Sequence, residues 1–184
     1  MTPLCLKMKK NKKRFIQLVA YGLIIFILSW FFQSQATTTF LFIRHADIGI
    51  ATGGSNPPLS QEGYNHSVAL IDRLIDIDIT AGIDQIYVDD TLRSYETALP
   101  LSQQTNISIR RQDLSNAESF IGQSLRADKG KIILVVADDD MIPLLVEELH
   151  GSKNLPRGGA LTQDQLYIVT SPWYGKVKTL KINL

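Results

Sequence analysis

The sequence predicts an α/β domain with a single, mostly parallel β-sheet flanked by helices on both faces. Two observations predict this fold. Short apolar segments rich in β-branched and aromatic residues alternate with longer segments whose apolar residues recur every three or four positions, as strands and amphipathic helices do. The alternation starts near Thr38 and continues to the C-terminus without an internal repeat or a second domain. The 148 residues that follow position 36 are enough for one domain with its own core.

The individual elements follow from these patterns and from the turn residues between them. A first amphipathic helix is expected at residues 60–78, with Ser60 as its cap and an apolar face made of Val68, Leu70, Ile71, Leu74 and Ile75. Further helices are expected at residues 91–104, ending or kinking at Pro100, and at 114–125 and 141–150. Strands are expected at residues 39–43, 85–90, 107–111, 131–137, 164–170 and 176–184, the last two forming a hairpin.

The first 36 residues differ in composition from the rest. Six basic residues and no acid lie in positions 1–14: Lys7, Lys9, Lys10, Lys12, Lys13 and Arg14. The uncharged residues 15–32 are near the lower limit of a membrane helix, which takes about 17–25 residues. The positive flank predicts that residues 1–14 stay in the cytoplasm and that the domain at residues 37–184 lies on the periplasmic or extracytoplasmic side.

Residues 15–36 fit either a transmembrane anchor or a signal peptide. The Ser-Gln-Ala sequence at positions 34–36 has small residues where a signal peptidase cleaves, whereas the bulky aromatic residues at 30–32 favour an uncleaved anchor. A buried core helix is disfavoured by the unopposed positive charges. Cys5 is the only cysteine, so residues 37–184 have neither a disulfide nor thiol chemistry. Those residues carry a net charge near −5, which argues against a nucleic-acid-binding domain.

Charged residues gather where the predicted strands end, which is where ligands bind in such sheets. These are Arg44 and His45, then Asp89, Asp90 and Arg93, then Asp138, Asp139 and Asp140. A neutral imidazole can accept a phosphoryl group and return it to water, and arginines hold phosphate oxygens in bidentate geometry. An isolated Arg-His pair is more often a packed strand-end histidine beside a surface charge, so the pair by itself does not assign the chemistry.

The segments around these residues resemble the histidine phosphatase superfamily, also called phosphoglycerate-mutase-like, from about Thr38 to the C-terminus. The segments FLFIRHAD and NPPLSQEG are similar to the family's first strand, with its Arg-His signature, and to the motif that follows it. YVDDTLRSYETALPL is similar to the second motif, in which an arginine precedes a Thr-Ala pair on a helix. VVADDDMIPLLVEEL and DQLYIVT resemble two later segments in the expected order.

The resemblance implies a role for each matching position. His45 would be the phosphorylated nucleophile, and Arg44 and Arg93 would be phosphate ligands. Asn56 replaces a frequent aspartate of the first loop and would help to bind substrate. The proton donor would be an acid after the third strand, for which Glu118 is the first candidate and Asp113 the second, although Glu118 fits equally well as a solvated helix charge. The family needs no metal and no cofactor.

Asp138 falls where the family has its second catalytic histidine, and the other two histidines, at 66 and 150, are not expected to reach that position. Three explanations compete. In the first, the run of aspartates caps the following helix, which suits Asp139 or Asp140. Alternatively, crowding by other carboxylates keeps Asp138 protonated, so that it donates the missing hydrogen bond. In the third, phosphatase chemistry is lost and the site binds something else, such as a divalent cation.

These observations lead to two hypotheses about function. The first is a membrane-anchored or exported phosphomonoester hydrolase that acts through a phosphohistidine on His45. Its substrate would be a small phosphorylated molecule or a phosphate-bearing component of the cell envelope. The second is a catalytically impaired relative that serves as a ligand-binding or interaction module at the envelope.

Overall fold

The computed structural model describes residues 3–34, 37–49, 56–76, 82–156, 161–162 and 164–184. The chain divides into two compact units, Met1–Ala36 and Thr37–Leu184.

The first unit is the helix α1 (Pro3–Ser34). Within it, Lys12–Phe32 is long and apolar enough to cross a membrane, and none of its residues is buried. Among the described residues it is the one helix that meets these criteria. An N-terminal signal sequence has a similar length and composition, so the helix fits both a membrane anchor and a signal peptide.

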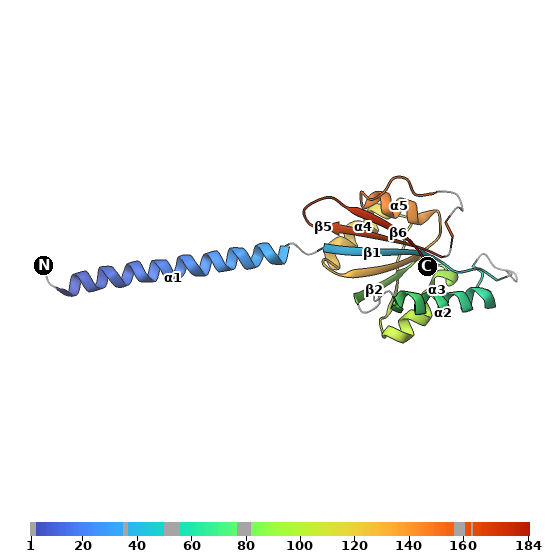
Figure 1. Cartoon of the computed structure of the whole chain (residues 1–184), viewed down its shortest axis with the longest axis horizontal. Coiled ribbons are helices and arrows are strands. Elements are labelled where there is room, and N and C mark those ends of the chain that lie inside the picture. The colour runs from blue at the N-terminus through green and yellow to red at the C-terminus, as the bar shows by residue number, and fades with distance from the viewer. Residues whose placement is uncertain (1–2, 35–36, 50–55, 77–81, 157–160, 163) are drawn as a thin grey trace. The chain divides into compact units, whose positions relative to one another are not determined.

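The second unit is built on a six-stranded sheet with the order β3-β2-β4-β1-β5-β6 (Figure 1). The strands are β1 (Thr37–Arg44), β2 (Ile83–Val88), β3 (Ile109–Arg111), β4 (Ile132–Ala137), β5 (Gln165–Pro172) and β6 (Lys178–Asn183). β1 to β4 are mutually parallel, but β5 runs antiparallel to both β1 and β6. The sheet is therefore mixed, and the prediction of a mostly parallel sheet was wrong. The predicted final hairpin is confirmed, and it is this hairpin that adds the antiparallel pairs.

Helices cover both faces of the sheet (Figure 1). The helices α2 (Gln61–Asp76) and α3 (Leu92–Thr105) lie on one face, and α4 (Ala117–Ala127) and α5 (Met141–Glu148) on the other. The side chains of β1 alternate between the two cores, because successive residues of a strand point to opposite faces. Phe40 and Phe42 pack under α4 and α5, whereas Leu41 and Ile43 pack under α2 and α3.

Two local predictions differ from the structure and a third is confirmed. α3 continues through Pro100 to Thr105, so the proline does not end it. On α2, Leu70, Ile71 and Leu74 are buried as predicted but Val68 is exposed, while the side chain of Ile75 lies outside the described residues. Ser60 caps α2 as predicted, because its Oγ accepts a hydrogen bond from the amide of Gly63 at 2.9 Å.

Candidate active site

The register of the sheet brings the predicted site residues together. β1 and β4 are parallel neighbours in which Arg44 pairs with Ala137, so the next residues, His45 and Asp138, leave the sheet side by side. β2 flanks β4 on its other side, and α3 starts four residues after β2 ends, which places Arg93 in its first turn. Three separate segments therefore deliver a histidine, an aspartate and an arginine to one edge of the sheet.

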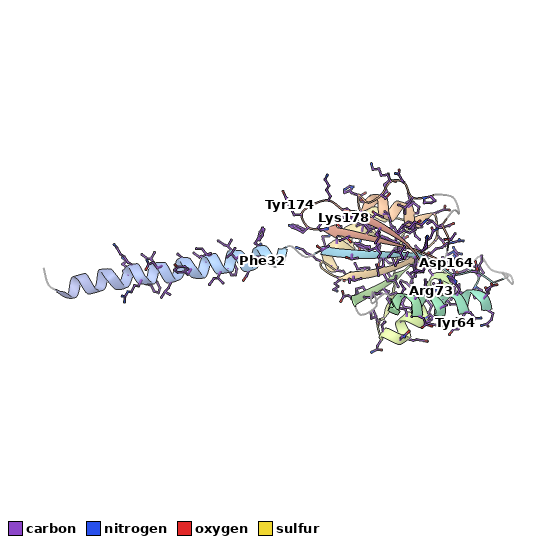
Figure 2. The ribbon with its side chains drawn as sticks, viewed as in Figure 1. Phe32, Tyr64, Arg73, Asp164, Tyr174 and Lys178 are labelled. Carbon is purple, nitrogen blue, oxygen red and sulfur yellow. The ribbon has the colours of Figure 1, made fainter. Side chains whose placement is uncertain are left out.

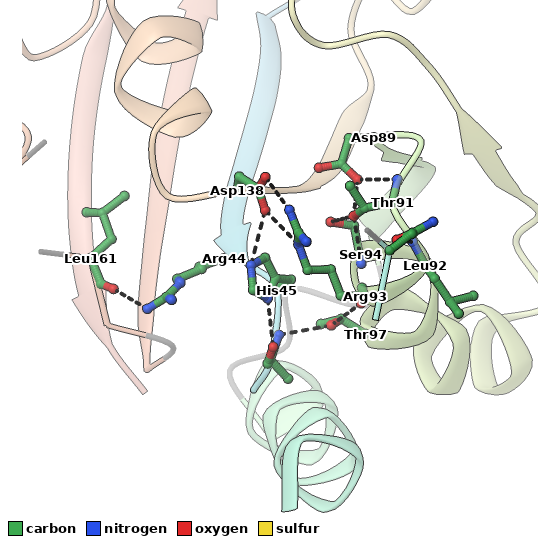
Figure 3. A network of polar contacts seen from close by, with 12 residues as sticks. Arg44, His45, Asp89, Thr91, Leu92, Arg93, Ser94, Thr97, Asp138 and Leu161 are labelled. Atoms are coloured by element: carbon green, nitrogen blue, oxygen red, sulfur yellow. Dashed lines mark hydrogen bonds and ion pairs between the residues drawn. The ribbon is translucent and has the colours of Figure 1, made fainter. Parts of the chain in front are cut away.

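These three side chains form an ion triad, His45–Asp138–Arg93, with the carboxylate in the middle (Figure 3). Arg93 binds the carboxylate in bidentate fashion. Its Nε donates to Oδ1 at 2.9 Å and its Nη2 donates to Oδ2 at 2.6 Å. The Nε2 atom of His45 lies 3.1 Å from the same Oδ1. The His45 side chain is only 9% exposed and that of Asp138 is 31% exposed, so the triad is shielded from water over most of its surface.

The hydrogen bonds of His45 determine which nitrogens carry protons. Its Nδ1 lies 2.7 Å from the carbonyl oxygen of Ala46. A carbonyl only accepts, so Nδ1 must donate and hold a proton. A neutral ring would then have a free lone pair on Nε2, the arrangement that a nucleophile needs. An ionised Asp138 also only accepts, so its contact with Nε2 is a hydrogen bond only when both ring nitrogens are protonated. In that form the Nε2 atom has no free lone pair for nucleophilic attack.

Asp138 is ionised in this setting. Its pKa is lowered well below the usual range, chiefly by the hydrogen bond with His45 and then by the hydrogen bond and charge of Arg93, which together outweigh the desolvation that opposes them. The bond with Asp138 in turn raises the pKa of Arg93. The hypothesis that crowding keeps Asp138 protonated is therefore wrong, because the guanidinium of Arg93 and the imidazole of His45, not carboxylates, contact it.

Among the other aspartates of the site, Asp89 is engaged in local structure, Asp139 is half-buried, and Asp90 and Asp140 are exposed. Oδ1 of Asp89 accepts hydrogen bonds from the amide and the hydroxyl of Thr91 at 2.9 and 2.5 Å, and Thr91 in turn caps α3. Asp140 occupies the N-cap position of α5 but makes no side-chain capping bond, so the capping explanation is wrong for it. Within the part of the chain that the structure describes, no three His, Cys, Asp or Glu side chains are grouped as a metal site requires.

Thr97 holds the loop after β1 against α3, a role that the sequence analysis did not assign. Its buried Oγ1 accepts a hydrogen bond from the amide of Ala46 at 3.0 Å and donates one to the carbonyl of Arg93 at 2.7 Å. The signal was available, since Thr97 is the threonine of the Thr-Ala pair in the second motif. One hydroxyl thus fixes the backbone next to both His45 and Arg93.

Replacing Thr97 with valine should destabilise the domain by about 1–3 kcal/mol, because the buried amide of Ala46 loses its partner while the side-chain volume is kept. Urea denaturation of residues 37–184 measures the difference. Thr97→Ser, which keeps the hydroxyl, is the matched control and should retain more of the stability. A Thr97→Val variant as stable as the wild type would show that the hydrogen bond does not contribute to stability.

The remaining predicted site residues lie elsewhere. Arg44 turns away from the ion triad and donates from Nη1 to the carbonyl of Leu161 at 2.9 Å (Figure 3). Asn56 accepts a hydrogen bond from the amide of Leu92 at 2.8 Å, which ties the first loop to the start of α3. Neither contact excludes a phosphate ligand, and neither supplies one. Their roles in binding phosphate stay predictions.

The two candidate proton donors do not contact the ion triad. Glu118 is exposed on α4 and lines a hollow together with Glu148 and His150, and the triad has no part in that lining. Asp113 accepts hydrogen bonds from Ser115, which lower its pKa, whereas a general acid at neutral pH needs a raised pKa. Glu118 therefore remains the better of the two candidates, and its role stays a prediction.

Comparison with known proteins identifies the fold. No family model and no curated protein matches the chain. Among solved structures, the protein histidine phosphatase SixA complexed with tungstate superposes with a TM-score of 0.64 at 17% identity, covering 79% of this chain and 96% of that chain. A mycobacterial glucosyl-3-phosphoglycerate phosphatase superposes with a TM-score of 0.58 at 14% identity, covering 80% of this chain and 98% of the other.

The chain has the fold of the histidine phosphatases. This agrees with the resemblance inferred from the motifs, although the low identity shows the fold alone. His45 and Arg93 meet at the carboxyl ends of the parallel strands, where α/β proteins of this kind bind their ligands.

Proposed function

We propose that this chain is a membrane-anchored phosphomonoester hydrolase in which His45 is the nucleophile and Arg93 the phosphate ligand, and in which Asp138 restrains turnover. One observation carries the proposal: Arg93 and His45 converge on a single oxyanion, the carboxylate of Asp138. A guanidinium fork that binds a carboxylate in bidentate fashion binds a phosphate in the same way. Asp138 thus takes the contacts that a phosphoryl group would take.

The restraint follows from this competition. A substrate phosphate must displace Asp138 from Arg93 and from Nε2 of His45 before the nucleophile is free. It then meets the displaced carboxylate, which repels it and cannot donate a hydrogen bond. The family that the sequence resembles has a histidine at this position. Asp138 therefore explains both why Arg93 and His45 already bind an oxyanion and why we propose that turnover is slow.

The decisive assay uses the full-length chain in lipid nanodiscs with a panel of phosphomonoesters between about pH 4 and 8, the range in which histidine and carboxyl groups titrate. We expect slow hydrolysis that His45→Ala abolishes and that His150→Ala, a histidine outside the ion triad, leaves unchanged. Radiolabelled substrate should leave an acid-labile phosphoenzyme on the wild type. Absence of both turnover and phosphoenzyme across the panel would contradict the proposal for these substrates.

A second candidate function is favoured by the ion triad itself. If substrate phosphate cannot displace Asp138, the domain is a catalytically silent module that binds a partner at the cell envelope. Isothermal titration calorimetry with inorganic phosphate distinguishes the hydrolase from the silent module. Binding that Arg93→Gln weakens supports the hydrolase, whereas no binding at millimolar phosphate supports the silent module.

The proposed location rests on α1 and on the charges before it. Lys12–Phe32 would span the membrane as an uncleaved anchor, with residues 1–14 in the cytoplasm and the globular unit on the periplasmic side. Resistance to alkaline carbonate extraction, together with the mass of the mature chain, distinguishes the anchor from a cleaved signal peptide. Protease added to spheroplasts, in which the periplasmic face of the membrane is accessible, should digest the globular unit and so tests the orientation.

A further inference from the structure

The turn between β5 and β6 lies at the end of the sheet opposite the ion triad. β5 ends at Pro172, which pairs with Thr37, the first residue of β1. His45 follows the other end of β1. An eight-residue strand separates the two ends, a span of about 26 Å at 3.3 Å per residue. Figure 2 shows Tyr174 of this turn at the end of the sheet where β1 begins.

Two aromatic side chains are exposed at this turn (residues 173–177, the aromatic turn). Trp173 is 69% exposed and Tyr174 is 85% exposed, the largest exposures of the large hydrophobic side chains described in the globular unit. The Nζ atom of Lys129 lies 4.2 Å from the centre of the Trp173 ring, and Lys176 is exposed in the same turn. Aromatic residues beside lysines are the combination that anchors proteins at the membrane–water interface.

Two acidic side chains near this end of the sheet, Asp128 and Asp84, accept hydrogen bonds within the fold. Asp128, next to Lys129, is buried and is held by Lys131 at 2.8 Å and by the hydroxyl of Tyr87 at 2.7 Å. Asp84, near the start of β2, uses its carboxylate to accept a hydrogen bond from the amide of Ile132 at 2.9 Å. On the side of α4 and α5, Glu118 and Glu148 line the hollow that the turn borders, whereas Lys129 and Lys176 lie beside the two aromatic side chains.

The stretch of sequence that joins the proposed membrane span to the globular unit is short. Five peptide units join Phe32, the last residue of the span, to Thr37. Fully extended, they reach at most about 18 Å. Because Thr37 pairs with Pro172, the aromatic turn begins beside the point where the tether enters the sheet. A tethered surface needs little intrinsic affinity, since its local concentration at the bilayer is high.

We infer that the aromatic turn, with Trp173 and Tyr174 at its tip and Lys129 and Lys176 beside it, docks into the headgroup region of the bilayer that holds α1. The inference rests on the membrane anchor in the proposed function. Docking orients β1 away from the bilayer, so the ion triad faces the aqueous compartment. The site would then act on water-soluble phosphomonoesters or on groups that project from the envelope, rather than on lipid headgroups of its own leaflet.

Fluorescence of Trp173 tests the inference in the full-length chain. The protein has two tryptophans, so Trp30→Phe leaves Trp173 as the one reporter. In nanodiscs containing lipids brominated near the headgroup, Trp173 emission should fall at least about two-fold relative to discs of ordinary lipid, as for an interfacial aromatic residue. A second protein, with Trp30→Phe, Trp173→Phe and Tyr64→Trp, reports from exposed Tyr64 on α2 and should be quenched far less.

The outcomes separate this inference from the proposals on which it rests. Quenching of Trp173 well above that of the Tyr64→Trp reporter supports docking. Equal or absent quenching in a chain that resists carbonate extraction overturns docking but leaves the membrane anchor in place. A blue-shifted Trp173 emission that brominated lipid does not quench also overturns docking, because the tryptophan is then covered by a protein surface. A chain that carbonate releases overturns both. Phosphatase activity is measured separately, so its absence bears on the site alone.

Discussion

Replacing Asp138 with histidine is expected to raise phosphomonoesterase activity about 100-fold, the scale on which one donor to a transition-state oxyanion acts. The substitution releases the guanidinium of Arg93 and the Nε2 atom of His45, both of which the carboxylate now engages. It also supplies a hydrogen-bond donor where the wild type has an acceptor. The gain should appear mainly in kcat/KM, measured with a chromogenic phosphomonoester.

Two controls make this result specific. Asp140→His changes the same residue type two positions away, at an exposed aspartate with no side-chain capping bond, and should leave activity unchanged. His45→Ala in the Asp138→His background should remove the gained activity, because the nucleophile is lost. Activity that does not rise, or that persists without His45, would show that Asp138 is not what restrains the site.

The same substitution should change how the domain responds to phosphate. Asp138→His removes the carboxylate that contacts both Arg93 and His45, so phosphate or an analogue can take its place. Thermal unfolding of the variant should therefore shift upward with added phosphate more than that of the wild type, since a ligand that binds the native state stabilises it. A shift equal in both proteins would indicate a phosphate site other than the ion triad.

How far the sequence predicts this site is best seen in Asp138 and Arg93. Alternating strands and helices, together with the rule that ligands bind at strand ends, predict that His45, Arg93 and Asp138 lie near one another, and the structure joins them. The sequence does not predict their pairing. Counting nearby acids suggests that repulsion raises the pKa of Asp138, whereas side-chain geometry places the guanidinium and the imidazole against it.

Other limits of the sequence have similar causes. Arg44 directly precedes His45, but adjacent residues of a strand point to opposite faces, and its side chain turns to Leu161 instead. The hairpin at residues 164–184 was predicted, but the strand that it would join was not, because pairing between distant segments leaves little trace in a single sequence. Its placement beside β1 makes the sheet mixed and brings Trp173 next to the start of β1.

Asp138→Asn should destabilise residues 37–184 at neutral pH by about 1–3 kcal/mol, the contribution of charge-assisted hydrogen bonds. In the folded wild type, the pKa of Asp138 is lowered by His45 and Arg93, and in the unfolded chain it returns to about 3.9. A lowered folded pKa gives stability that is fully present above the unfolded pKa and is lost as the pH falls toward the folded pKa. The part of the wild-type advantage that comes from the carboxylate charge should therefore be lost as the pH falls below about 4.

Urea denaturation of the two proteins at pH 7 and at pH 3 measures this dependence directly. Asp140→Asn is the matched control, because Asp140 is exposed and has no side-chain capping bond, and it should differ from the wild type by less than about 0.5 kcal/mol at both values. A difference for Asp138→Asn that is the same at both pH values would mean that the carboxylate charge adds nothing to folding. Since the restraint on turnover that we propose depends on that same charge, it would then need another cause.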